Sequence, residues 1–487
     1  MIINPITKRI TYAILLSAAL LLAGCKKEKG AVGSITDPVT PPITPVAPVK
    51  TDVTMWLTQS DQSALLQKQN QSLIFNTGTN TNPTIEVDTT QIYQAIDGFG
   101  FTLTGGSATV INKLPATQRD NLLKELFSTD STHIGISYLR ISLGASDLSA
   151  APFTYDEGPI DADLQNFSID AERADLLPVL KSIIALNPTI KILACPWTAP
   201  TWMKTNGSFK GGSLNTAYYD AYARYFVKYI QAMKAEGITI DAITPQNEPL
   251  NPNNNPSLVM QASEQANFIK NNLGPQFKSA NIAAKIIVYD HNADRTDYPL
   301  AILADNDAGK YVDGSAFHLY GGLISALGPV HDAFPNKNIY FTEQWVGAPG
   351  NFSSDFQWAI NNLIIGATRN WSRNVLEWNL ATDASYGPHT VGGCSTCQGA
   401  LTITNGVTRN TSYYIIGQAS KFVRPGSVRI ASNNFDNLQN VAFKTPDGKK
   451  VLIVSNTTSS IQAFNIKFNG KVVSTTLAGM SVATFIW

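Results

Sequence analysis

This sequence has few cysteines, few histidines and no net charge, and each of these features argues against a class of function. The 487 residues include four cysteines and five scattered histidines. Lysine and arginine together number 36, as do aspartate and glutamate, so the formal net charge is zero. Without a basic or acidic field the chain is not expected to bind nucleic acid, and a neutral ligand is favoured.

The N-terminus has a short apolar run. Residues Ala13–Leu22 follow two basic residues and end in LLAGC. The run is too short to span a bilayer comfortably as a helix, and its flanks are typical of a secretory signal. LLAGC resembles a bacterial lipobox, which implies a lipoprotein signal peptide, 1–24, cleavage before Cys25 and a lipid on its thiol. The alternative is an ordinary signal peptide with a chance cysteine.

Residues 25–50 are predicted to form a tether. KKEKG is followed there by DPVTPPITPVAPVK, a composition that cannot build a core and favours extended chain. The protein is therefore expected to be an exported lipoprotein of the cell envelope, held to the membrane through Cys25.

No metal or nucleotide cofactor is expected. Cys394 and Cys397 have the spacing of half a zinc site, but the chain offers no second cysteine pair. A local disulfide between them is favoured over two free thiols in an exported chain. Cys195 is interpreted as a small buried residue. The glycine-rich stretch 98–106 lacks the spacing of a phosphate-binding loop.

Residues 92–420 alternate short apolar runs with longer amphipathic segments. Helix-like segments at Tyr218–Glu236, Pro256–Leu273 and Ser353–Trp371 separate runs such as TIKILACPW, AKIIVYDHN and NIYFTEQW. Eight such repeats predict an α/β fold, a (β/α)8 TIM barrel whose strands are buried on both faces.

The apolar runs share an asymmetry, because each begins apolar and ends polar or aromatic. In a (β/α)8 barrel the site lies at the carboxyl ends of the strands. The residues at these ends are Arg140, Trp197, Asn247, Glu248, Asp290, His291, His318, Tyr320, Glu343, Trp345, Trp378 and Asn379.

The two ends of the chain have a different character. Residues 421–487 are predicted to form short alternating strands, with a hairpin at Asp447-Gly448. Residues 51–91 contain similar material, SLIFN and TIEVD. We therefore expect a side β-sandwich domain built from both chain ends. A purely structural role is favoured for it over a dedicated sugar-binding module.

Two carboxylates carry the chemistry. Glu248 closes the fourth barrel run and Glu343 the seventh, so the barrel should bring them to one mouth. Two carboxylates facing each other across a neutral ligand are suited to glycoside hydrolysis, although either alone could form an ordinary salt bridge. For a retaining mechanism their carboxyl groups should lie roughly 5–5.5 Å apart, against about 6.5–9.5 Å for an inverting one.

Aromatic residues near the strand ends favour a sugar ligand. Sugar rings present C–H faces to indole and phenol rings while their hydroxyls seek polar partners, and a carbohydrate pocket combines both. The aromatic residues in question are Trp197, Trp202, Tyr320, Trp345 and Trp378. Trp202 is equally well explained as a core residue.

The motifs GFGFTLTGGSA, CPWTAPTWMKTNG, TPQNEP, FHLYGG, FTEQW and EWNLATD, in this order, resemble those of glycoside hydrolase family 30. The resemblance covers nearly the whole mature chain and implies a retaining enzyme with Glu248 as acid/base and Glu343 as nucleophile. Arg140 would hold the nucleophile ionised, and Asn247 would contact the sugar 2-hydroxyl. By the same resemblance Asp147, Trp197 and Trp378 line the sugar pocket, and His318 and Tyr320 lie beside the nucleophile.

These roles imply different pKa values for the two glutamates. Burial and the charge of Glu343 are expected to raise the pKa of Glu248 so that it keeps its proton. Arg140 and neighbouring donors are expected to keep Glu343 ionised.

Two loops indicate the substrate. Many family members have an acidic residue where this chain has Gly105 or Gly106, and the loss of that carboxylate weakens the expectation of glucosylceramide specificity. GFGFTLTGGSA and GGCSTCQGALTI resemble the β-1,6-glucanase branch, so a β-glucan substrate is expected. Glucosylceramidase, β-glucosidase and xylanase activities are the alternatives within the family.

A protein of another class, a surface lipoprotein that binds glycans without cleaving them, shares the tether, the aromatics and the sandwich. A glycan-binding protein does not need two glutamates at strand ends, so an enzyme is favoured. The enzyme is expected to act as a monomer. Release of reducing sugar from β-1,6-glucan distinguishes the two.

Overall fold

A computed structural model describes residues 49–130 and 133–487. The predicted signal peptide, Cys25 and all but the last two residues of the predicted tether lie outside the described residues. Val49–Trp487 forms one compact unit. Within the described part of the chain, none of the helices combines the length and the apolar character needed to cross a membrane.

Eight parallel strands close into a barrel, which confirms the predicted fold class. Around the barrel the strands follow chain order, and the last pairs with the first. They are β4 (Gly98–Leu103), β5 (Tyr138–Ser142), β6 (Lys191–Cys195), β7 (Ala242–Ile243), β8 (Lys285–Asn292), β9 (Val312–His318), β10 (Asn338–Glu343) and β12 (Ser372–Glu377).

The connections between barrel strands contain helices. The α-helices are α1 (Gly105–Asn112), α2 (Ala116–Phe127), α3 (Leu176–Leu186), α4 (Tyr219–Ala235), α5 (Ala262–Phe268), α6 (Gly274–Ser279), α7 (Asp297–Ala304), α8 (Asn306–Gly309), α9 (Leu327–Ala333) and α10 (Phe352–Ala359), and α11 (Thr411–Ser420) follows the last strand. Short 3-10 turns are η1 (Asp170–Glu172), η2 (Thr201–Met203), η3 (Thr216–Tyr218) and η5 (Ile324–Ala326).

The predicted helix at Pro256–Leu273 begins later than expected. Its first α-helical residue is Ala262, because Gln261 and Glu264 form a capping box that satisfies the free N–H groups at that point. It continues through a π-helical turn, η4 (Ile269–Leu273), into α6. Helix α10 likewise continues as the π-helix η6 (Ile360–Ala367).

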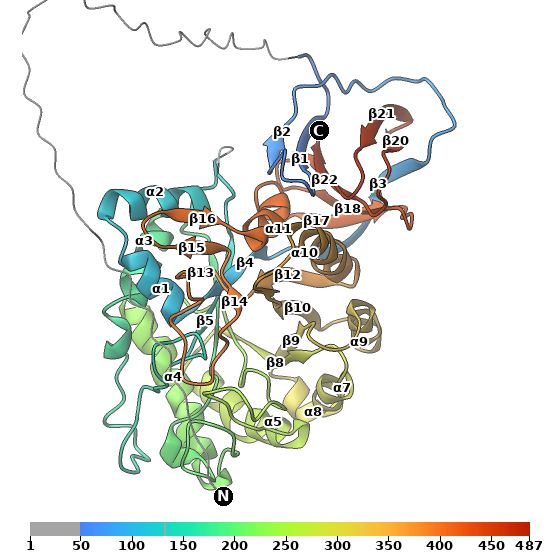
Figure 1. The fold of residues 1–487 in the computed structure, drawn as a ribbon. Coiled ribbons are helices and arrows are strands. Elements are labelled where there is room, and N and C mark those ends of the chain that lie inside the picture. The colour runs from blue at the N-terminus through green and yellow to red at the C-terminus, as the bar shows by residue number, and fades with distance from the viewer. Residues whose placement is uncertain (1–48, 131–132) are drawn as a thin grey trace, which may run out of the picture. The chain divides into compact units, whose positions relative to one another are not determined.

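Strands from both chain ends interleave in one nine-stranded sheet. The early strands β1 and β3 lie among the last strands of the chain, as their blue and red colours show (Figure 1). The strands are β1 (Thr54–Thr58), β2 (Gln67–Lys68), β3 (Thr84–Ala95), β17 (Val428–Ser432), β18 (Leu438–Lys444), β19 (Lys450–Asn456), β20 (Gln462–Phe468), β21 (Lys471–Leu477) and β22 (Val482–Ile486).

The sheet forms a sandwich around its own apolar core. The long strand β3 pairs in parallel with β20 near its start and antiparallel with β17 further along, so it joins two parts of the sheet. Ile85, Phe464 and Phe485 are among the buried residues between them. This arrangement is the side β-sandwich that the alternating patterns at the two chain ends predict.

The loops above the barrel carry small strands of their own. Strand β11 (Val346–Gly347) pairs with β14 (Cys397–Gln398), and β13 (Ala381–Thr382), β15 (Leu401–Ile403) and β16 (Val407–Arg409) form a second small sheet. These segments follow the last residues of β10 and β12, so they stand at the end of the barrel where the predicted site lies.

Candidate active site

Two glutamates face each other at the mouth of the barrel. Glu343 is the last residue of β10, whereas Glu248 lies beyond the short strand β7. One carboxylate oxygen of each and a ring nitrogen of His318 all lie within 4.8 Å of one another. Glu248, Glu343 and His318 are buried. The barrel therefore brings together the carboxylates that the sequence places far apart.

Glu343 is held from two sides. The buried Arg140 on β5 donates from Nη1 to Oε2 of Glu343 at 2.6 Å. The Tyr320 hydroxyl, just beyond β9, donates to Oε1 at 3.0 Å. A second nitrogen of Arg140 donates to Oδ1 of Asn247 at 2.6 Å. The carboxylate of Glu343 is thus fixed in orientation.

Glu248 has neutral amide donors and one histidine as partners. Asn251 donates to Oε2 at 2.7 Å and Asn254 donates to the same oxygen at 3.2 Å. Nδ1 of His318 lies 3.3 Å from Oε1 of Glu248 and 3.8 Å from Oε1 of Glu343. His318 therefore lies between the two carboxylates.

Asp290, which the sequence marks only as a strand-end residue without a specific role, is a fully buried carboxylate near the end of β8. Its Oδ2 accepts from Nη2 of Arg140 at 2.9 Å, and its Oδ1 lies 3.1 Å from Nε2 of His318. Hydroxyls of Thr244 and Thr342 also donate to it. Asp290 orients the two cations beneath the glutamates. Its position at the end of the apolar run AKIIVYDHN was the signal that could have found it.

A cavity of about 490 Å³ opens above these groups. The residues named from the sequence that line it are Asp147, Trp197, Glu248, His291, Tyr320, Glu343, Trp345, Trp378, Cys394 and Cys397. Arg140, Asn247 and His318 are buried and do not line it. Sequence reasoning missed the loop Leu250–Asn254 and Asn292, which also form its wall.

Indole rings form part of the cavity wall. The ring centroids of Trp197 and Trp378 are 5.4 Å apart, and the guanidinium of Arg140 lies 4.7 Å from the ring centroid of Trp197. Trp345 pairs with Trp378 through an isolated β-bridge. Trp202 packs against the core and donates to the backbone oxygen of Asp156, so it lies outside this wall.

The expectation that Glu248 has a raised pKa is wrong. Burial opposes ionisation of Glu248, but His318 and Asn251 outweigh it and lower the pKa of Glu248 to about 2. Burial raises the pKa of Glu343 above its ordinary value of 4.5, against the attraction of His318 and Arg140. The sequence-based prediction failed because it left out His318.

His318 carries a proton at neutral pH. Burial disfavours its charge, but Glu343, Asp290 and Glu248 together raise the pKa of His318 to about 9. Among the described residues, Glu248, His318 and Glu343 form the one group close enough to hold a metal ion. Metal binding there would require removal of that proton, so His318 is better described as a hydrogen-bond donor, through Nδ1 to Glu248 and through Nε2 to Asp290.

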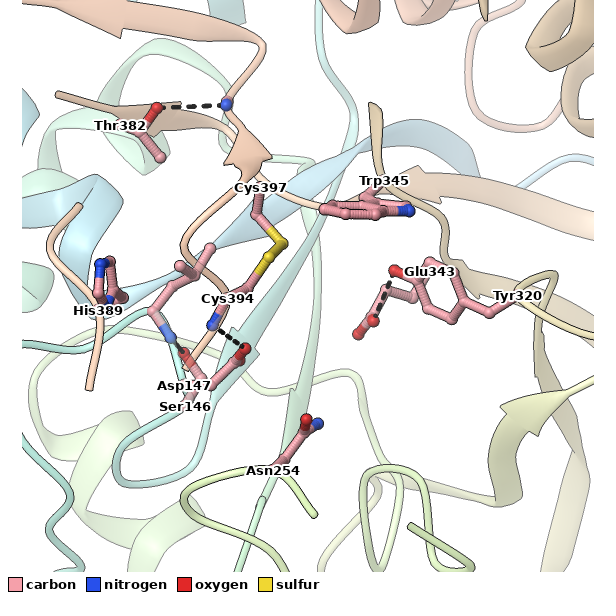
Figure 2. The surroundings of a disulfide bond; sticks show 12 residues. Ser146, Asp147, Asn254, Tyr320, Glu343, Trp345, Thr382, His389, Cys394 and Cys397 are labelled. Atoms are coloured by element: carbon pink, nitrogen blue, oxygen red, sulfur yellow. Dashed lines mark hydrogen bonds between the residues drawn. A yellow bond between two sulfur atoms is a disulfide. The ribbon is translucent and has the colours of Figure 1, made fainter. Parts of the chain in front are cut away.

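A disulfide forms another part of the wall. The sulfurs of Cys394 and Cys397 are 2.09 Å apart. Figure 2 shows the bond between Asp147 on one side and Trp345 on the other. The third described cysteine, Cys195, is a buried free thiol below the cavity, where its sulfur contacts Asp290.

Paired carboxylates at the mouth of a (β/α)8 barrel, in a cavity walled by indoles, asparagines and a tyrosine, define a glycoside hydrolase. Family models agree with this class. Residues 96–423 match the glycosyl hydrolase family 30 TIM-barrel domain, and residues 426–485 match the family's β-sandwich domain. The chain belongs to glycosyl hydrolase family 30.

Relatives with curated descriptions share most of the chain. The endo-1,6-beta-D-glucanase neg1 of Aspergillus fumigatus is 37% identical over 75% of this chain and 79% of its own. Putative glucosylceramidase 4 of Caenorhabditis elegans is 30% identical over 80% of each chain. Among solved structures, the endo-beta1,6-glucanase BT3312 superposes with a TM-score of 0.85 at 36% identity, covering 90% of this chain and 99% of the other.

Proposed function

We propose that the protein is a retaining endo-glycosidase that cleaves β-1,6-linked glucan. The observation that carries the mechanism is that one carboxylate oxygen of Glu248 and one of Glu343 lie within 4.8 Å of each other. An inverting enzyme needs about 6.5–9.5 Å between its carboxyl groups to hold a water molecule behind the sugar. The shorter separation supports direct attack by one carboxylate on the anomeric carbon.

Glu343 is the better nucleophile of the pair. Arg140 and Tyr320 hold both of its oxygens, which orients the carboxylate at fixed positions. In the first step an oxygen of Glu343 bonds to the anomeric carbon, the glycosidic C–O bond breaks, and the leaving oxygen takes a proton. The product is a glycosyl-enzyme and a shortened glucan.

His318 and Glu248 together supply that proton. Nδ1 of His318 lies 3.3 Å from Oε1 of Glu248, so a proton held by the ring can pass through this carboxyl to the leaving oxygen. The charge of Glu343 is the leading interaction that keeps His318 protonated. When Glu343 becomes an ester it loses this charge, the pKa of His318 falls, and the proton is released at the moment it is needed.

The second step reverses these roles. Glu248 accepts a proton from water, the resulting hydroxide oxygen attacks the anomeric carbon, and Glu343 leaves as a carboxylate. The restored charge on Glu343 raises the pKa of His318 again, and the proton passes from Glu248 to Nδ1 of His318. The site therefore returns to its starting protonation state after each cycle.

The β-1,6 linkage is proposed from the similar proteins that are described as β-1,6-glucanases. The test is initial hydrolysis rates on β-1,6-, β-1,3- and β-1,4-glucans, xylan and glucosylceramide. We expect β-1,6-glucan to be cleaved fastest and to yield oligosaccharides before glucose. Faster cleavage of glucosylceramide would support the glucosylceramidase relatives instead, and glucose as the sole early product would contradict endo action.

We further propose that the chain is exported and carries a lipid on Cys25. The LLAGC motif supports this. Expression in a bacterial host with radiolabelled palmitate tests it. Label should enter the wild-type chain but not Cys25→Ala, and equal labelling of both would contradict the proposal.

A further inference from the structure

The loop that carries the Cys394–Cys397 disulfide contacts three other segments of the site. The disulfide itself lines the cavity and belongs to the apolar cluster of Trp197 and Trp378. Figure 2 shows Cys394 turned toward Asp147 and Cys397 toward Trp345. A four-residue ring closed at the cavity wall leaves the backbone between the two cysteines few alternative conformations.

The first contact is with Asp147, the buried carboxylate in the cavity wall. The backbone N–H of Cys394 donates to Oδ2 of Asp147 at 3.3 Å. The backbone N–H of Thr390 donates to the Asp147 carbonyl at 2.8 Å. At Gly393 an added Cβ would lie only 2.5 Å from that carbonyl. The loop therefore lies directly against Asp147 at both its side chain and its backbone.

The second contact is with the segment that follows the nucleophile. Cys397 pairs with Gly347 in the two-stranded sheet of β11 and β14. The Thr396 carbonyl accepts from the Ala348 N–H at 2.8 Å. Because Glu343 precedes this segment by only a few residues, the disulfide loop and the nucleophile share one small framework.

The third contact is with the segment after Glu248. Asn255 donates from its side chain to the Val391 carbonyl at 3.0 Å. The Thr390 hydroxyl donates to the Asn255 carbonyl. The loop thus connects Asp147 with the segments that follow both glutamates.

We propose that the Cys394–Cys397 disulfide is a positioning element that holds the Cys394 N–H on Asp147 and so fixes this carboxylate for the hydroxyls of the bound sugar ring. The inference rests on the proposed function, because it assigns the disulfide a role in binding the same glycosyl unit. Loss of the bond leaves the cavity residues in place but frees the N–H donor.

The electrostatics of Asp147 provide a readout. Burial and the charges of Glu343 and Glu248 raise the pKa of Asp147 to about 7, against the lowering effect of the Cys394 N–H. Tyr320, whose own pKa is raised well above its ordinary value, also faces this group and stays neutral. If the N–H moves away, the pKa of Asp147 rises further. The acidic limb of kcat/KM should then move to higher pH.

The test compares the full-length wild type with Cys394→Ser/Cys397→Ser and with the matched control Ser395→Ala. Ser395 lies exposed between the two cysteines, so its substitution keeps the ring closed. Removing one donor to a charged group predicts KM higher by roughly tenfold on β-1,6-glucan and on an aryl β-glucoside, with kcat within about twofold. The control should match the wild type.

A double-mutant cycle with Asp147→Asn isolates the coupling. If the disulfide acts through Asp147, its loss should add little to KM once the carboxylate is gone. Additive losses, or an unchanged KM and pH profile in the folded double-cysteine variant, would overturn the proposal. A second measurement, reductant added to the wild type, should reproduce the variant's KM and leave the variant itself unchanged.

Circular dichroism melts of all variants check that each is folded. The activity of the wild-type protein shows whether a negative result contradicts the role of the disulfide or the proposed function. Activity on β-glucan with no effect of the disulfide would overturn the positioning role alone. A wild type inactive on every β-glucoside would overturn the proposed function on which it rests.

Discussion

At the scale of single residues, the site contains more carboxylates than positive charges. Arg140 and the protonated His318 supply two positive charges to three carboxylates, Asp290, Glu248 and Glu343. Asp290 touches both cations and its pKa is held well below its ordinary value. The proton on His318 is close to both Glu248 and Glu343, so the titrations of these three groups are coupled.

The two glutamates should respond differently to substitution. Glu343→Gln removes the nucleophile and should reduce kcat on every substrate by about 10⁴-fold or more. Glu248→Ala removes the proton path, so its loss should be severe on a glucan and mild on a dinitrophenyl glucoside, whose leaving group needs no proton. Azide should accelerate only Glu248→Ala. Equal losses on both substrates without an azide effect would contradict the assignment.

The pH profile of kcat/KM should be bell-shaped. Glu343 and Asp147 must both be ionised, and their raised pKa values place the acidic limb above pH 4.5. The proton on His318 must be present, and its pKa places the alkaline limb near pH 9. His318→Gln should abolish the limb near 9 and lower kcat more on glucan than on the dinitrophenyl glucoside. An alkaline limb that stays near 9 in that variant would contradict the role of His318.

The residue types at the strand ends could be predicted from the sequence, but the effects of neighbouring groups on their pKa values could not. The motif order placed Glu248, Glu343 and Arg140 correctly at one mouth, because parallel strands bring their carboxyl ends together. The pKa of Glu248 depends on one histidine nitrogen 3.3 Å away. Such a contact depends on side-chain positions to within an ångström, which hydrophobic periodicity does not specify.

At the scale of secondary-structure elements, two neighbouring barrel strands, β4 and β5, approach each other closely at a glycine. Gly100 on β4 lies opposite Tyr138 on β5. A Cβ at Gly100 would lie 1.9 Å from the Tyr138 carbonyl oxygen. The glycine is required there because two strands of the barrel approach too closely for a side chain.

Gly100→Ala should therefore destabilise the barrel. Because the clash is with backbone, β4 must shift from β5, and we expect a loss of about 2–3 kcal/mol or more in the free energy of unfolding. Gly406→Ala is the control, since nothing lies within 4 Å of a Cβ there. Thermal melts of both variants make the measurement, and equal midpoints would contradict this account of β4.

Loop conformations were the part of the site that sequence patterns did not predict. Glu248 has φ of 44° and Asp290 has φ of 66°, in the left-handed region that non-glycine residues seldom adopt. The Glu248 N–H donates to the Asp290 carbonyl at 3.0 Å. These backbone positions are set by tertiary contacts, which explains why Glu248 lies beyond β7 instead of closing it.

At the scale of the whole molecule, the sandwich and the barrel are joined by polar contacts. Arg369, after η6, donates to backbone carbonyls of Ser432 and Asn440. Gln418 on α11 donates to the Thr58 hydroxyl at 2.7 Å. The alternating patterns at both chain ends predicted the sandwich, but these contacts involve residues more than sixty positions apart and have no signal in a single sequence.

The two domains should therefore unfold together. Thermal unfolding followed by activity and by near-ultraviolet circular dichroism should give coincident midpoints, and Arg369→Ala should lower both by the same amount. Two separate transitions in the wild type would contradict this, because they would mean that the interleaved sheet is stable without the barrel.

The most direct test of the central claim is the anomeric configuration of the first product. Proton NMR can follow wild-type protein acting on β-1,6-glucan from the earliest minutes. Attack by Glu343 and then by water inverts the anomeric carbon twice, so β reducing ends should appear first and α reducing ends later by mutarotation. Initial release of α reducing ends would contradict the retaining mechanism, and no release from β-1,6-glucan would contradict the proposed substrate.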